Sequence, residues 1–219
     1  MSGLKLGIVS QTPLIRFKKQ FEKFDKINLR DLSEEDYSYT VGGVTAMEKV
    51  LSEYLLENKI TSEIHWFSLN PGAPRHVILS NNFHLYNVSL PHNLLTQYTS
   101  FKETLWNNIH GIGNRSFNLR DYLGYLHHNW KLTENVLNTS SDFDIYVIHD
   151  FQQLLMGNFI GPSKPAVLRW HIPFIPEYFN KQIKKFILNS FEGFDSVIVS
   201  TKRDLEGLIR VGFRGHAYQ

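Results

Sequence analysis

The sequence contains no cysteine among its 219 residues. Disulfides, thiolate metal sites, iron–sulfur ligation and cysteine nucleophiles are therefore excluded. A strong charge of one sign is also missing, because 23 basic and 21 acidic side chains leave a formal net charge of only +2. This balance favours neither a nucleic-acid partner nor an anionic membrane surface, so the identity of any ligand depends on individual sites.

Long hydrophobic runs are missing as well. The N-terminal apolar stretch is interrupted by Lys5, Ser10 and Gln11, so it lacks the continuous core of a signal peptide. No segment elsewhere approaches the roughly 20 apolar residues of a membrane span. Hydrophobic residues still make up 42% of the chain, enough for a buried core, and we expect a soluble, cytoplasmic protein.

Short apolar runs alternate with amphipathic stretches, which is typical of βαβ units. We predict an α/β fold with a Rossmann-like parallel sheet flanked by helices, in one domain over residues 1–219, because no repeat or linker divides the chain. The predicted strands are 4–9, 62–67, 77–79, 145–148, 167–172 and 196–200; the predicted helices are 45–56, 94–109, 119–137, 152–159, 177–191 and 202–211. Five apolar residues at helical spacing carry the first helix, namely Met47, Val50, Leu51, Tyr54 and Leu55. The polar stretch ahead of this helix is expected to be loop or a short lid.

Two adjacent glycines, Gly42 and Gly43, stand directly ahead of the first predicted helix. Glycines let a backbone approach a ligand closely, and free N–H groups at a helix N-terminus attract anions. This turn is therefore a candidate site for a phosphate or diphosphate. An ordinary turn explains the same pair of glycines, and the pair alone does not decide between them.

A second candidate site lies where an apolar strand ends in His149 and Asp150. Open α/β sheets bind ligands at the carboxyl ends of their parallel strands, and a carboxylate there can accept hydrogen bonds from sugar hydroxyls. Alternatively, Asp150 only caps the helix predicted to begin near Gln152.

A third candidate site is the string Arg169, Trp170 and His171 at the end of the next predicted strand. If the strands are parallel, His171 lies at the same edge as Asp150. Arg169 adds a fixed cation, and Trp170 offers an aromatic face that could pack on a sugar ring, although tryptophan is more often a core residue.

The remaining motifs give little support to other chemistries. His127 and His128 are adjacent, so on a helix they point in different directions, and we expect no metal site. The sequence also lacks a nucleophile elbow, a phosphate-binding loop of the Walker type and a dinucleotide-binding glycine motif. Hydrolase, nucleoside-triphosphatase and dehydrogenase functions therefore lose their main support.

Taken in order, three short blocks resemble retaining glycosyltransferases of the two-Rossmann-domain (GT-B) type. They are Gly42-Gly43-Val44, His149-Asp150-Phe151-Gln152 and His171-Ile172-Pro173-Phe174. The last two are similar to the His-Asp-Tyr and His-Ile-Pro-Phe-Pro blocks of trehalose-phosphate synthases, except that Ile175 replaces the final proline. The first block and the string Arg169-Trp170-His171-Ile172 resemble trehalose glycosyltransferring synthases, which carry Arg-Cys-His-Ile.

The resemblance implies an N-terminal, acceptor-side domain for transfer of glucose from a nucleotide sugar, such as UDP-glucose or ADP-glucose, to glucose or glucose 6-phosphate. Gly42 and Gly43 would lie near the donor diphosphate. Asp150 would bind sugar hydroxyls, and His171 would lie against the reacting glucosyl group. We further expect the neighbouring residues His149, Arg169 and Trp170 to contact substrate. No cofactor is implied. The partner would be a C-terminal nucleotide-binding domain that this sequence does not contain, and without it we expect little or no activity.

Two alternatives stay open. The chain can be a binding module that keeps the fold without catalysis. It can also belong to a retaining transferase with a different glycan or lipid-linked acceptor, because acceptor choice depends on loops that the sequence does not decode.

Overall fold

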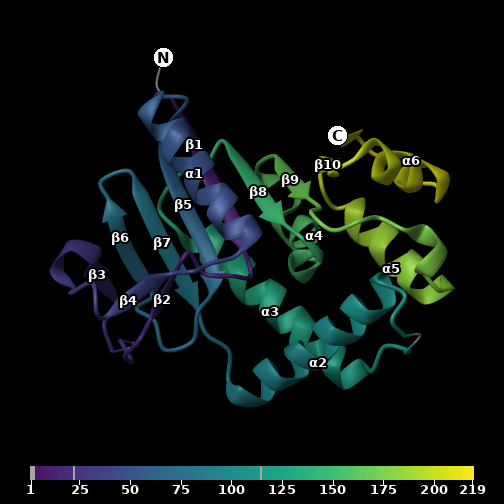
Figure 1. The fold of residues 1–219 in the computed structure, drawn as a ribbon, viewed down its shortest axis with the longest axis horizontal. Helices are drawn as coiled ribbons and strands as arrows, with labels where there is room; N and C mark the ends of the chain where they lie inside the picture. Colours follow the sequence, from purple (N-terminus) through teal and green to yellow (C-terminus); the bar gives the residue numbers. More distant parts are fainter. Residues whose placement is uncertain (1–2, 22, 114) are drawn as a thin grey trace. The chain divides into compact units, whose positions relative to one another are not determined.

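The structure is a computed structural model that describes residues 3–21, 23–113 and 115–219 (Figure 1). Its contacts divide the chain into two compact units. Unit 1 comprises Met1–Ser89 and Glu134–Val147, and unit 2 comprises Leu90–Thr133 and Ile148–Gln219. The expectation of one domain over residues 1–219 stays a prediction.

Unit 1 is built on strands that pair mainly in parallel. β1 (Leu4–Ser10) pairs in parallel with β5 (Thr61–Leu69), and β5 pairs in parallel with β7 (Phe83–Val88). β6 (His76–Ser80) runs antiparallel to β7, and β3 (Lys26–Asn28) runs parallel to β6. Outside this sheet, β2 (Ile15–Phe17) and β4 (Tyr37–Tyr39) form an antiparallel pair, and a 3-10 turn covers Leu29–Asp31.

One face of the unit 1 strands carries the hydrophobic core. Ile8, Ile64, Trp66 and Leu85 are almost fully buried there. Their neighbours in sequence point to the other face, because side chains alternate along a strand. The opposite face of β5 is covered as well, because Phe67 is fully buried on it, and polar side chains share that face.

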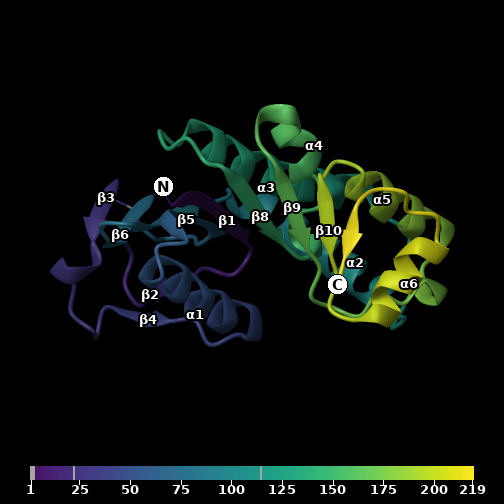
Figure 2. The same ribbon diagram turned by 90° about the horizontal axis from the view of Figure 1, so that it is seen from above.

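Helix α1 (Gly43–Glu57) lies against the unit 1 strands (Figure 2). The prediction of this helix is confirmed, but its apolar residues do not mark its buried face. Thr45, Glu48 and Ser52 are buried, whereas Val50 and Tyr54 are more than half exposed. An apolar cavity of about 230 Å³ lies in this unit, bordered by Leu51 and Leu55 of the helix and by residues of β1, β5 and β8 (Ile145–His149).

Unit 2 contains the carboxyl end of β8 (Ile145–His149), whose first three residues belong to unit 1, and three further strands. β10 (Ser196–Ile198) pairs in parallel with β9 (Ala166–Arg169) and with β11 (Ala217–Tyr218). Its helices are α2 (His92–Ile109), α3 (Leu119–Asn138, up to Thr133), α4 (Met156–Ile160), α5 (Lys181–Phe191) and α6 (Lys202–Arg210), with 3-10 turns at Phe151–Gln153, Gly161–Ser163 and Pro176–Tyr178.

Among the described residues, nine strands form a mostly parallel sheet flanked by helices, and the predicted α/β fold class is confirmed. Some predicted elements were wrong in detail. The helix predicted over 177–191 begins only at Lys181, because the Asn180 side chain caps it by accepting from Ile183 N–H. The helix predicted over 152–159 is a 3-10 turn followed by α4, and the strand predicted over 167–172 ends at Arg169. The stretch expected to be loop contains β2, β3 and β4, and β7 was not predicted.

Close contact between α2 and α3 within unit 2 depends on Gly124. A Cβ atom at this position would lie 2.5 Å from both Gln97 Cβ and Tyr98 N. We expect Gly124→Ala to lower the free energy of unfolding by about 1 to 3 kcal/mol, because a backbone atom of α2 must shift. Urea denaturation measures the change. Gly113→Ala is the control, since its added Cβ meets nothing within 4 Å in the part of the chain that the structure describes. Equal midpoints for the two variants would contradict this packing.

Candidate functional site

The ends of β8 and β9 are joined by two hydrogen bonds from Asp150. Its backbone N–H donates to Arg169 O at 2.9 Å, and its carboxylate Oδ1 accepts from His171 N–H at 2.9 Å. The predicted strand ends therefore do lie side by side within unit 2. The Asp150 side chain bonds to the neighbouring strand end, and it does not cap the turn that begins at Phe151.

The Asp150 backbone is strained. Its φ of 60° and ψ of −175° belong to a region that is almost confined to glycine. Only one other described non-glycine residue, Lys59, has a positive φ. Such strain costs on the order of 1 to 3 kcal/mol and is found where a structure must hold one side chain in one place, often at a ligand site.

Two histidine rings stack beside Asp150. His149 Nδ1 and His171 Nε2 are 2.8 Å apart, and the ring centroids are 5.1 Å apart with 18° between the planes. Burial, assisted by the charges of His171 and Arg169, lowers the pKa of His149 to about 3. Burial and the Arg169 charge lower the pKa of His171 to about 4. Both rings are therefore neutral at pH 7, and one ring N–H donates to the other ring.

Burial has the opposite effect on the Asp150 carboxyl group. It raises the pKa of Asp150 to about 6, although the His171 N–H and the Arg169 charge act in the other direction. The Arg169 guanidinium itself donates to Val199 O at 2.7 Å. The site therefore combines a carboxylate that is ionised at some cost with two uncharged imidazoles, which is an arrangement suited to binding hydroxyl groups.

Trp170 does not contribute an aromatic face to this site. Its side chain is 0% exposed and packs edge-to-face against Phe174 and Phe191. Trp170 lies in the core, whereas its neighbours Arg169 and His171 are partly exposed. Trp170 is therefore a core residue, which is the alternative that the sequence left open.

Helix α3 positions the turn that follows Asp150, a role that the sequence did not indicate. The Tyr125 hydroxyl donates to Phe151 O at 2.5 Å and accepts from Leu154 N–H at 3.2 Å. Asn129 donates to Gln152 O at 3.1 Å and accepts from Leu155 N–H at 3.1 Å. Both side chains are fully buried polar groups of a helix, and only the folded structure reveals which turn they bond.

The glycine turn belongs to unit 1. Gly42 is the N-cap of α1, with φ −156° and ψ 146°, which any residue can adopt. A Cβ at Gly43 would meet nothing within 4 Å of the described chain, and one at Gly42 would make only an ordinary 3.6 Å contact with Thr45 Oγ1. No acidic residue stands in the first helical turn, and no described side chain caps it. The fold itself therefore does not require glycine at these two positions.

Comparisons with known proteins identify the fold. No family model and no curated protein sequence matches this chain. Solved structures do match, with TM-scores above 0.6. An E. coli trehalose-6-phosphate structure bound with UDP-2-fluoro glucose matches at TM-score 0.67 and 20% identity, over 94% of this chain and 42% of that chain. The chain thus has the fold of the N-terminal half of a two-domain GT-B glycosyltransferase.

Two Burkholderia structures give the same result. The UDP-forming α,α-trehalose-phosphate synthase of Burkholderia vietnamiensis matches at TM-score 0.65 and 18% identity, over all of this chain and 48% of that one. The Burkholderia xenovorans synthase in complex with glucose 6-phosphate matches at 0.62 and 17%, over 92% and 41%. The chain therefore spans less than half the length of these synthases.

Within the described residues, no helix has both the length and the apolar character needed to cross a membrane.

Replacing Asp150 tests the cost of its charge. The pKa of Asp150 is raised in the folded protein, so the folded state favours the protonated carboxyl group. The stability that this group contributes is therefore complete below about pH 4 and is lost as the pH rises through about 6. Asp150→Asn lacks this loss and retains an acceptor for His171 N–H. We expect the variant to gain stability relative to the native chain between pH 4 and pH 7, by up to about 3 kcal/mol.

Urea unfolding at several pH values measures this difference. The control is Asp195→Asn, which alters a carboxylate that accepts from Ala166 N–H in the same unit. A difference between Asp150→Asn and the native chain that does not change with pH would contradict the assigned electrostatics.

Proposed function

We propose that the chain is the acceptor-side domain of a retaining glycosyltransferase that moves glucose from a nucleotide sugar to glucose or glucose 6-phosphate. The observation that carries the proposal is Asp150, whose backbone is strained and whose carboxylate bonds to the neighbouring strand end, beside two stacked histidines. Its support is the position of this group, since sheets of this kind bind ligands at the carboxyl ends of their strands. The molecules bound in the E. coli and B. xenovorans neighbours, UDP-2-fluoro glucose and glucose 6-phosphate, belong to the proposed donor and acceptor classes.

The protonation states suit transfer with retained configuration. Such a reaction develops positive charge on the glucosyl ring as the diphosphate leaves. Neutral His149 and His171 add no positive charge beside that ring, because their pKa values lie near 3 and 4. The Asp150 carboxylate accepts hydrogen bonds from sugar hydroxyls and favours the developing positive charge electrostatically. In this proposal His171 contacts the reacting glucosyl group, and Arg169 fixes the end of β9 through Val199 O.

Gly42 and Gly43 have the second role in the proposal. Their free N–H groups at the start of α1 would face the donor diphosphate, which is attracted to a helix N-terminus. Neither backbone angle nor packing demands glycine there, so close approach of a ligand is a sufficient reason for it. In this proposal a separate nucleotide-binding domain would supply the remaining donor contacts.

Sugar binding tests the strand-end site directly. We expect this chain to bind glucose 6-phosphate in a calorimetric titration, and His171→Gln and Asp150→Asn each to weaken binding at least tenfold. His127→Gln is the matched control, because His127 is exposed on α3. Binding unaffected by both site variants, or absent from the native chain, would contradict the proposal. Binding with no glucosyl transfer, when a nucleotide-binding domain is supplied, would favour the binding-module alternative.

The Gly43→Ala variant distinguishes a role of this glycine in ligand binding from a role in folding. The free energy of unfolding should change by less than about 0.5 kcal/mol, since the added methyl group meets no described atom within 4 Å and alanine is a good helix former. Affinity for UDP-glucose or ADP-glucose should nevertheless fall about tenfold, because the methyl group obstructs the diphosphate. Thermal denaturation and calorimetry measure the two effects. A loss of stability without loss of nucleotide-sugar affinity would assign this glycine to the fold.

A further inference from the structure

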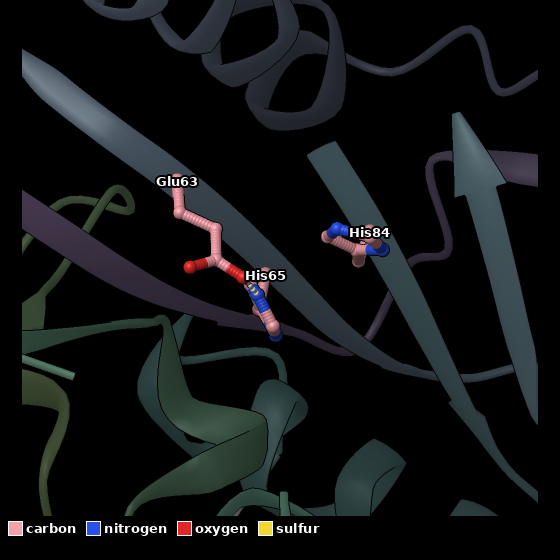
Figure 3. A group of neighbouring side chains, drawn as sticks. All are labelled: Glu63, His65 and His84. Carbon is pink, nitrogen blue, oxygen red and sulfur yellow. Dashed lines mark hydrogen bonds and ion pairs between the residues drawn. The ribbon is translucent and has the colours of Figure 1, made fainter. Parts of the chain in front are cut away.

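Three potential metal ligands meet on the strand face opposite the core of unit 1. Glu63 and His65 lie two residues apart on β5, and His84 stands opposite His65 in the β5–β7 pair (Figure 3). One ligand atom from each of the three side chains lies within 4.8 Å of the other two. No local sequence motif joins them, because the strand register brings them together.

Glu63 is already oriented for coordination. Its Oε1 lies 2.6 Å from His65 Nε2, and its Oε2 pairs with Lys5 Nζ at 3.3 Å. The Ser141 hydroxyl also donates to Glu63 Oε1 at 3.2 Å. The Oε2 atom thus holds the side chain in place through Lys5, while Oε1 shares a hydrogen bond with His65.

The two imidazoles are held in definite orientations. His84 Nε2 lies 3.2 Å from the carbonyl of Asn81, and His84 Nδ1 lies 3.1 Å from His76 Nε2. A backbone carbonyl bonded to one ring nitrogen is the usual second contact of a metal-bound histidine. The His65 side chain is 3% exposed, and its Nδ1 has no hydrogen-bond partner among the described residues. That nitrogen can carry the ring proton when Nε2 gives its lone pair to a cation.

We propose that Glu63, His65 and His84 bind one divalent transition-metal ion of the Zn²⁺ class. Two imidazole nitrogens with one carboxylate favour Zn²⁺, Co²⁺ or Ni²⁺ over Mg²⁺ and Ca²⁺, which prefer oxygen ligands. The ion takes the place of the hydrogen bond between Glu63 and His65, and His84 releases one of its two present hydrogen bonds. Bonds of about 2.0 to 2.2 Å require the three side chains to close around the ion, and partly exposed His84 has the freedom to do so.

The site differs from the one expected for glucosyl transfer. Its residues belong to β5 and β7 of unit 1, and none of them is part of the proposed sugar or diphosphate contacts. The ion would bridge β5 and β7, and we infer that it stabilises this sheet. No metal site was expected from the sequence, because the adjacent residues His127 and His128 lack metal-ligand spacing and no local motif joins the three residues of this cluster.

Metal titration of the native chain tests the proposal. We expect saturable binding of one Zn²⁺ per chain, a higher unfolding temperature with Zn²⁺, and the visible absorption of Co²⁺ bound by few ligands. Ligand binding to the folded state alone raises stability in proportion to the logarithm of metal concentration above the dissociation constant. None of these readouts depends on glycosyltransferase activity.

Variants identify the ligands. His84→Gln and Glu63→Gln should each lower Zn²⁺ affinity at least tenfold and remove the Co²⁺ absorption, while circular dichroism reports that both remain folded. His127→Gln, at an exposed helix position in unit 2, should bind like the native chain. If Glu63→Gln loses its fold, His84→Gln decides, because His84 is partly exposed and outside the core. Non-saturating binding by the native chain, or native affinity in His84→Gln, would overturn the proposal.

Discussion

Parallel pairing of strands is the constraint on which the candidate site depends. Parallel strands end at the same edge of a sheet, so residues that follow different strands meet there although they are far apart in sequence. Asp150 follows β8 and His171 follows β9, and the ends are joined by the hydrogen bond between these two residues and by that from Asp150 N–H to Arg169 O. Trp170, one residue away, points into the core and anchors the same segment by packing against Phe174 and Phe191.

The electrostatics of this edge run against stability. Burial keeps His149 and His171 neutral, yet it makes the ionised form of Asp150 costly, and the Asp150 backbone is strained as well. A fold selected for stability alone would place glycine or asparagine at this position. Natural proteins retain such unfavourable groups where binding or catalysis needs them, and this is the physical reason to regard the strand ends as functional.

The sequence was sufficient for the α/β class, for most helices and for the two strand ends, because these depend on local periodicity and on chain order. It was insufficient for elements whose position depends on pairing between strands or on packing between distant segments. β7 was missed although Phe83, Leu85 and Val88 are buried along it, and the short strands ahead of α1 have too few residues to establish a period. The packing of α1 was also hidden, since buried Glu48 and Ser52 break the expected amphipathic pattern. The cluster of Glu63, His65 and His84 had no local signal at all.

The alternation of faces along β5 and β7 links this cluster to the hydrophobic core. Ile64 and Trp66 enter the core from one face of β5, so His65 between them must project from the other, and Leu85 fixes His84 in the same way. A slip of one residue in either strand would exchange its two faces, so its histidine would move to the side of the present apolar core and its core residues to the other side. Burial of the core residues therefore selects the strand register, and this register also fixes the positions of the histidines. A chain with shifted strands would lose core burial and the cluster together.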